Sequence, residues 1–198
     1  MNLLFFVKSS TINLEHYAIK DIPGSSGRLD VISRCVLAAI LSEGDFEKEV
    51  QIWVFLDNYG TFLFNPELLD YRNFPKNELK LTDYFARLLI KPNLPERPNN
   101  NPLNSIKTLN ISIFKAIKKF QKLNYSIFTL REDGKDFLKL KSRIQEKKNI
   151  LFIIGSQEDT FLNSKELLTL KIPSISIGNQ SYLASSVIKL LKLHTLVL

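Results

Sequence analysis

Short apolar runs and apolar stripes at helical spacing alternate along most of the chain. The apolar run at 3–7 and the run at 50–56, where Gln51 is the one polar residue, are typical of buried strands. The stripe between them predicts a helix over 28–42, because its apolar residues recur every three or four positions. A turn after the second run predicts a hairpin arm over 61–64, and a further stripe predicts a helix over 81–90.

The second half of the chain alternates strands and helices more regularly. A Pro- and Asn-rich stretch at 91–104 separates the two halves and predicts an unstructured surface loop. Strand–helix alternation of this kind favours an α/β domain whose parallel sheet is covered by helices. The expected strands lie at 106–111, 125–130, 149–154 and 171–177, and the expected helices at 112–123, 134–147, 164–170 and from 183 onward.

Charge adds a candidate partner. The net charge is +7, from 27 Lys and Arg against 20 Asp and Glu. Such an excess suits a polyanion such as RNA or DNA, or an anionic membrane surface. The helix expected at 112–123 carries four lysines, Lys115, Lys118, Lys119 and Lys122. They fit either a solvated helix face or an RNA-binding face.

The rare residue types exclude several classes of site. Cys35 is the single cysteine, which excludes an internal disulfide framework, and its place in an apolar stripe favours packing over nucleophilic chemistry. His16 and His194 are the only histidines, so a catalytic triad or a metal site is poorly supported. No apolar segment approaches the roughly 18 residues of a membrane span, and the N-terminus lacks a basic leader. We therefore expect a cytoplasmic protein without a metal.

Three expected strands end in residues suited to holding a small ligand. Leu130, Gly155 and Gly178 lie at these carboxyl ends, where open parallel sheets bind their ligands. The sequence has neither the glycine-rich dinucleotide motif nor a phosphate-binding P-loop. The three loops are thus expected to converge on one small ligand, held largely by backbone groups.

Four collinear segments carry a family resemblance. They are DIPGSSGRLDVISRC at 21–35, EDG at 132–134, IG at 154–155 and SIGNQSYLAS at 176–185. Together they resemble the signature segments of the archaeal tRNA pseudouridine(54) N1-methyltransferases, members of the SPOUT superfamily. The resemblance extends from about Asp21 to Val187, nearly the whole chain.

The resemblance implies a fold, a cofactor and partners. The fold would be a parallel-sheet α/β SPOUT domain with a C-terminal deep trefoil knot, a feature almost absent from other proteins. It would form one domain over 1–198, with an RNA-facing signature at 21–34 and a knotted cofactor-binding part at about 125–195. The cofactor would be S-adenosylmethionine, the substrate tRNA, and the enzyme a homodimer.

The resemblance also implies two sets of site residues. At Val187, which is predicted to contact the cofactor, the family usually has cysteine. The catalytic, RNA-facing set consists of Asp21, Arg28, Asp30 and Arg34. The predicted cofactor-binding set consists of Leu130, Gly155, Ile177, Gly178, Asn179, Gln180, Ser181, Tyr182 and Val187.

The implied reaction transfers a methyl group from a sulfonium sulfur to N1 of pseudouridine. N1 carries a hydrogen that must leave, and the uracil becomes anionic as it does. Arg28 or Arg34 could stabilise that charge, and Asp21 or Asp30 could accept the proton. For Asp30 and Arg34 the alternative is a surface i,i+4 ion pair, which contributes only ~0.3–0.5 kcal/mol.

Two other functions are compatible with the sequence. The chain could be a SPOUT methyltransferase for an rRNA pseudouridine or another RNA position. It could also be a non-catalytic RNA-binding protein that keeps the fold.

Overall fold

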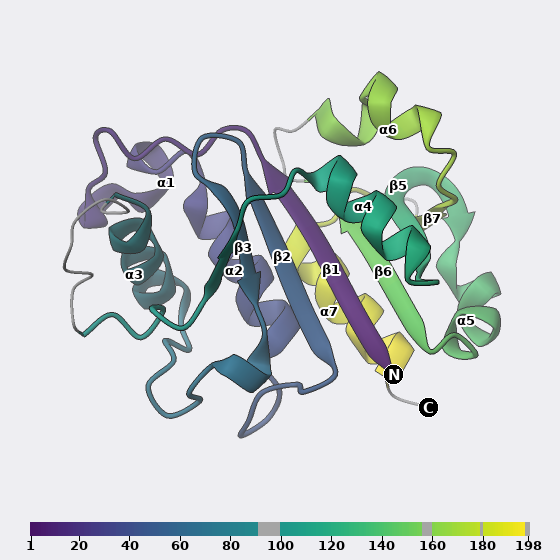
Figure 1. The fold of residues 1–198 in the computed structure, drawn as a ribbon, viewed down its shortest axis with the longest axis horizontal. Helices are drawn as coiled ribbons and strands as arrows, with labels where there is room; N and C mark the ends of the chain where they lie inside the picture. The colour runs from purple at the N-terminus through teal and green to yellow at the C-terminus, as the bar shows by residue number, and fades with distance from the viewer. Residues whose placement is uncertain (91–99, 156–159, 179, 197–198) are drawn as a thin grey trace.

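The computed structural model describes residues 1–90, 100–155, 160–178 and 180–196. Over these residues the chain forms a seven-stranded sheet in the order β4-β3-β2-β1-β6-β5-β7 (Figure 1). All pairings from β2 through β1, β6 and β5 to β7 are parallel, whereas β3 and β4 are antiparallel. The strands are β1 (Asn2–Ser9), β2 (Val50–Leu56), β3 (Gly60–Phe64), β4 (Lys107–Leu109), β5 (Ser126–Asp136), β6 (Asn149–Ile154) and β7 (Ser174–Ser176).

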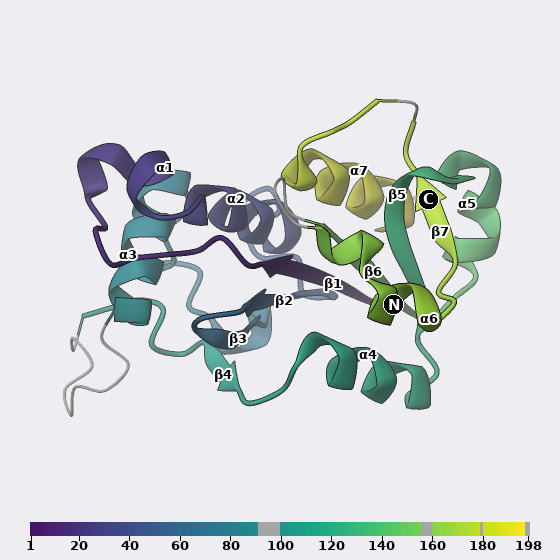
Figure 2. The ribbon, with the colours of Figure 1, turned by 90° about the horizontal axis from the view of Figure 1, so that it is seen from above.

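Helices cover both faces of the sheet (Figure 2). One face carries α1 (Ile22–Ser25), α2 (Leu29–Ile40), α3 (Glu78–Ile90), α5 (Phe137–Gln145) and α7 (Ala184–Leu196). The other carries α4 (Ile113–Lys122) and α6 (Lys165–Thr169). Three short 3-10 turns, η1 (Ile19–Asp21), η2 (Pro66–Leu68) and η3 (Thr160–Asn163), connect these elements.

Strand β1 lies at the centre of the sheet and contributes to a core on each face. Phe5 and its alternate neighbours pack under α2, α3 and α7, whereas Phe6 packs in the second core under α4. Successive side chains of a strand point to opposite faces, so a strand covered on both sides must be apolar throughout. This explains the uninterrupted apolar run at 3–7.

The prediction of an α/β domain is confirmed, and the sheet is mixed but mostly parallel. Several predicted boundaries were wrong by a few residues: α2 ends at Ile40, β7 spans only 174–176, and α7 begins after Leu183. Within the stretch predicted as a loop, 91–99 lie outside the described residues. The described end of the predicted loop, residues 100–104, packs against the domain, because Leu103 is buried and Asn101 Nδ2 donates to the carbonyl of Tyr84 at 2.9 Å.

The largest local difference lies in β5, where a helix was predicted to begin at Gly134. Instead β5 pairs with β7 twice, because Leu130 and Lys135 both face Ile175 and residues 131–134 loop out between them. A Cβ on Gly134 would lie 2.5 Å from the carbonyl carbon of Ile175, so only glycine allows the two backbones to approach this closely. Helix α5 therefore begins at Phe137.

No helix among the described residues has both the length and the apolar character needed to cross a membrane.

Candidate active site

A pocket of about 700 Å³ opens at the carboxyl ends of β5, β6 and β7. This volume lies within the range of small-molecule sites, and the position follows the rule for parallel sheets. The wall comes from five segments: the end of β5 with its looped-out residues, the end of β6, η3, the chain from β7 into α7, and Val31 of α2.

Eight of the nine predicted cofactor-binding residues line this pocket, and Asn179 lies outside the described residues. Val187 contributes from the first turn of α7, and Tyr182 contributes from the segment before that helix rather than from the helix itself. The fold thus brings together residues up to 57 positions apart, from Leu130 to Val187, at one edge of the sheet. Their contacts with a cofactor remain predictions. The eight are Leu130, Gly155, Ile177, Gly178, Gln180, Ser181, Tyr182 and Val187.

The turn at Gly178 forms part of the pocket lining. Its φ of 157° lies in a region that L side chains rarely adopt. Ser176 Oγ accepts a hydrogen bond from the Gly178 N–H at 3.2 Å and donates one to the Gly178 carbonyl at 2.7 Å, which holds the turn. A Cβ at this position would lie 3.2 Å from the Tyr182 hydroxyl. The glycine therefore preserves space that a side chain would occupy.

Arg131 braces two walls of the pocket against each other. Its Nε and Nη2 donate to the two carboxylate oxygens of Asp133, at 2.9 and 3.2 Å. Its Nη1 donates to the carbonyl of Leu162 at 3.0 Å and to Oδ1 of Asn163 at 2.7 Å. The guanidinium thus ties the looped-out residues of β5 to η3. Arg131 was not predicted as a site residue, although it directly precedes the EDG segment at 132–134.

Asp30 is the centre of a second charged cluster, on the first turn of α2. Its carboxylate accepts from Arg28 Nε and Nη2, at 3.1 and 3.2 Å, and from Arg34 Nη2 at 3.0 Å. Arg34 Nε also lies 3.4 Å from Oε2 of Glu78 on α3. The side chain of Asp30 is only 5% exposed. The i,i+4 ion pair of the alternative is thus present, but its carboxylate is buried rather than at the surface, on a helix that packs against α3 and α7.

Arg28 adopts a left-handed backbone conformation, with φ 70° and ψ 35°, immediately before α2. A residue with a Cβ rarely adopts this conformation, and such strain concentrates at functional sites. Ser26 Oγ accepts from the N–H of Leu29 at 3.1 Å and anchors the turn. The strained turn holds the Arg28 side chain 35% exposed beside Asp30.

The structure gathers three of the four predicted catalytic residues and leaves one elsewhere. Arg28, Asp30 and Arg34 form the cluster, and Val31, adjacent to Asp30, lines the pocket. Asp21 instead accepts a hydrogen bond from the N–H of Gly24 at 3.2 Å and caps α1 with an exposed side chain. None of the four lines the pocket itself.

Other candidate chemistry is limited in the part of the chain that the structure describes. Burial raises the pKa of the Cys35 thiol to about 12, so it stays protonated and packs within the core. No three His, Cys, Asp or Glu side chains of the described ranges gather where they could hold a metal ion.

Comparison with known proteins identifies the family. The sequence profile of the family described as "Putative SAM-dependent RNA methyltransferase" matches residues 1–197. The chain is 26% identical over 197 residues to the tRNA (pseudouridine(54)-N(1))-methyltransferase of Thermococcus onnurineus, covering 93% of this chain and 92% of the relative. It is 28% identical over 167 residues to the enzyme of the same name from Methanosarcina mazei, covering 82% and 75% of the two chains.

A solved structure has the same fold. The crystal structure of Archaeoglobus fulgidus Nep1 bound to S-adenosylhomocysteine matches with a TM-score of 0.64 and 14% identity. The match covers 98% of this chain and 97% of the other. From the profile match over nearly its whole length, the chain belongs to this family of SAM-dependent RNA methyltransferases.

Proposed function

We propose that the protein methylates N1 of pseudouridine 54 in the T loop of tRNA, with S-adenosylmethionine as the methyl donor. The observation that carries this proposal is the pocket at the ends of β5, β6 and β7, where eight predicted cofactor residues meet beside the Asp30 cluster. The relatives matched over most of the chain are named for this same reaction.

The residues present fit S-adenosylmethionine. Gly178 leaves room beside the hydroxyl of Tyr182, and apolar groups such as Leu130 and Val187 offer walls for an adenine ring. Backbone groups of Ile177, Gly178, the 180–182 segment and Gly155 would hold the polar parts of the cofactor. A backbone contact at Val187 does not need the cysteine that the family usually has there. When bound, the cofactor supplies an electrophilic methyl group on a sulfonium sulfur.

We assign Arg28 to stabilise the negative charge that develops on the nucleobase. Pseudouridine N1 must lose its hydrogen, and negative charge then develops on the uracil oxygens. A guanidinium held in place before the reaction stabilises such charge without reorganising. The partly exposed side chain of Arg28, fixed by Asp30 and a strained backbone, meets that requirement.

We assign Asp30 to positioning the arginines, and neither Asp30 nor Asp21 to accepting the proton. Both oxygens of Asp30 already accept hydrogen bonds from guanidinium groups, so this carboxylate is best suited to orienting Arg28 and Arg34. Asp21, the other predicted candidate, caps α1 apart from this cluster and from the pocket, so we assign the N1 proton to solvent water rather than to this carboxylate.

The proposal includes the family architecture. It takes residues 1–198 as one SPOUT domain, with the RNA-facing signature at 21–34 and a C-terminal knot within about 125–195. It also takes the enzyme as a cytoplasmic homodimer. Exposed apolar side chains at Tyr182, Leu183 and Leu193 support an interface beside the pocket, because they remain uncovered in one chain.

Methyl transfer to two matched tRNAs tests the proposed function. The two RNAs have the same sequence and differ only in having pseudouridine or uridine at position 54. We expect labelled methyl to enter only the first RNA, and mass spectrometry to identify 1-methylpseudouridine at position 54. Transfer to another position would support an enzyme with a different substrate. Binding of both RNAs without transfer would support a non-catalytic RNA-binding protein.

A further inference from the structure

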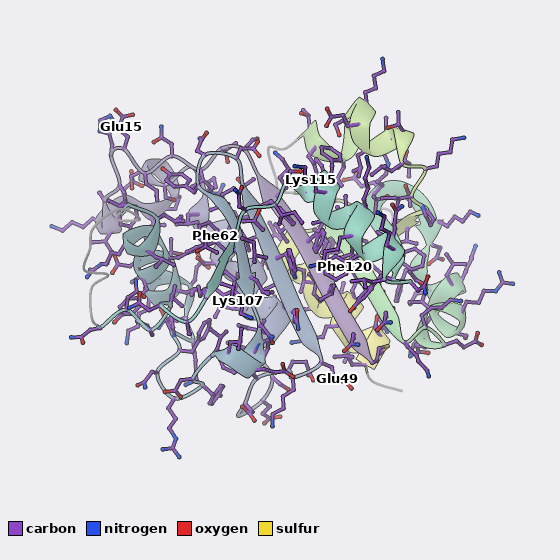
Figure 3. The ribbon with its side chains drawn as sticks, in the orientation of Figure 1. Glu15, Glu49, Phe62, Lys107, Lys115 and Phe120 are labelled. Carbon is purple, nitrogen blue, oxygen red and sulfur yellow. The ribbon has the colours of Figure 1, made fainter. Side chains whose placement is uncertain are left out.

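Helix α4 presents a continuous lysine face to solvent. Its four lysines follow the spacing i, i+3, i+4 and i+7, which places them along one side of a helix. All four are exposed, whereas the opposite side of α4 packs on the sheet through residues such as Ile117 and Phe120. Figure 3 shows Lys115 and Phe120 on α4, which lies in front of the sheet in this view. We call Lys115, Lys118, Lys119 and Lys122 the α4 lysine face.

The charge of this face is not balanced locally. The ten residues of α4 include no Asp or Glu. Within the described ranges, none of the four lysines takes part in an ion pair. Four uncompensated ammonium groups on one rigid helix form a positive stripe, and such a stripe is complementary to a polyanion.

The α4 lysine face begins beside the pocket wall. Phe114, in the first turn of α4, packs against Phe161 of η3 with 5.8 Å between the ring centroids. The two residues that follow Phe161, Leu162 and Asn163, line the pocket. From Lys115 the face extends away along the helix for roughly 10 Å, at about 1.5 Å per residue. A chain entering the pocket past η3 can therefore continue along α4.

We infer that the α4 lysine face binds the sugar–phosphate backbone of the tRNA whose pseudouridine enters the pocket. This inference rests on the proposed function for the identity of the RNA. Lysine is a compact cation without a fixed hydrogen-bonding fork, so it suits phosphate contacts that hold an RNA in place without selecting sequence. The pocket thus selects the nucleoside, and α4 supplies affinity and orientation.

The test replaces the four lysines of α4 by glutamine and compares the variant with a charge-matched control. In the control, Lys139, Arg143, Lys147 and Lys148, on and just after α5, are replaced by glutamine. All four are exposed, and either variant lowers the net charge from +7 to +3. We expect the α4 variant to bind tRNA about tenfold or more weakly at 100 mM salt. The slope of log K against log salt should flatten by about one for each phosphate that α4 no longer neutralises.

Kinetics separate the inference from the function on which it rests. The α4 variant should raise KM for tRNA and keep kcat and S-adenosylmethionine affinity, while the α5 control stays close to wild type. Equal losses in both variants would overturn the inference, because net charge alone would then explain binding. Two other results would also overturn the inference. One is an unchanged salt slope in the α4 variant, if the wild type methylates tRNA. The other is that the α4 variant loses binding to phosphatidylserine vesicles but keeps its binding to tRNA. If the wild type binds tRNA through α4 but methylates none, the proposed function fails and the α4 surface stands.

Discussion

The pocket is flanked by two arginine–carboxylate pairs with the same local geometry. In Arg28-Leu29-Asp30 and in Arg131-Glu132-Asp133, the arginine donates through Nε and Nη2 to the two oxygens of the aspartate two positions later. Their environments differ, because the side chain of Asp30 is 5% exposed and that of Asp133 is 73% exposed.

Two pairs with the same local geometry therefore take different roles from the residues that surround them. The buried pair recruits Arg34, and through it Glu78 of α3, so the carboxylate is fixed within the helical layer. The exposed pair adds bonds from Arg131 to η3 and spans the edge of the pocket. We therefore expect the first pair to determine stability and turnover, and the second to determine cofactor affinity.

Asp30→Asn should have the largest effect. The substitution removes the charge that two guanidinium groups share in a buried position, and hydrogen bonds to charged groups contribute about 1.5–3 kcal/mol each. Because both arginines are partly exposed, we expect a loss of about 2 kcal/mol in the free energy of unfolding, measured by urea denaturation. Turnover should fall at least about a hundredfold, since both arginines lose their orientation.

Asp133→Asn is the matched control for that substitution. Because this carboxylate is exposed, replacing it by an amide should leave the midpoint of urea unfolding unchanged. Equal destabilisation by the two asparagines would contradict the distinction between a buried and an exposed pair.

The sequence anticipated the first pair only in part. Spacing predicted that Asp30 and Arg34 meet, and they do, at 3.0 Å. The burial of Asp30 was not predictable from α2 alone, because α2 packs against helices that begin at Glu78 and Ala184, far later along the chain. An isolated i,i+4 pair has the same sequence pattern whether or not another helix covers it.

The sequence predicted the lining of the pocket better than it predicted the Arg131 hydrogen bonds that join two of the pocket walls, which we call the brace. Strand ends and the family resemblance together indicated Leu130, Gly155 and the 177–182 segment, because ligands bind at the carboxyl ends of parallel strands. Arg131 was missed because its partners Leu162 and Asn163 lie 31 and 32 residues away. The looped-out segment was missed because it depends on the pairing of β5 with β7.

Arg28→Ala should remove turnover without removing the cofactor. The loss of a preorganised donor typically lowers kcat by about 10²–10³-fold. Arg28 does not line the pocket, so calorimetry should give an S-adenosylmethionine affinity within about twofold of wild type. Retained turnover in Arg28→Ala would remove this arginine from the mechanism.

Gly178→Val should give the reverse result and abolish cofactor binding, because the valine side chain enters the space beside Tyr182.

Arg131→Ala should weaken cofactor binding by about tenfold. The substitution releases η3 from the looped-out residues of β5, and each charge-assisted hydrogen bond that it removes contributes on the order of 1 kcal/mol at a partly exposed site. Binding of S-adenosylmethionine, followed by calorimetry, measures the change. Asn163→Ala, which removes one of the four bonds, should show a smaller loss. Arg131→Lys should restore little, because an ammonium group lacks the planar fork. Wild-type affinity in Arg131→Ala would mean that the pocket walls hold without the brace.

The smallest predicted effect is a shift in the pKa of Asp133, the carboxyl group that Arg131 contacts. The hydrogen bonds from Arg131 hold the pKa of this carboxyl below its ordinary value. A lowered folded-state pKa means that the pair contributes fully above the unfolded-state pKa and is lost as pH falls through the folded-state value. The Arg131–Asp133 pair is therefore intact at neutral pH and is lost only in acid. Carboxyl titration by NMR should show the Asp133 pKa rising towards its ordinary value in Arg131→Ala. An unchanged pKa would mean that the guanidinium does not hold this carboxylate in solution, and that its bonds to Leu162 and Asn163 alone join the two walls.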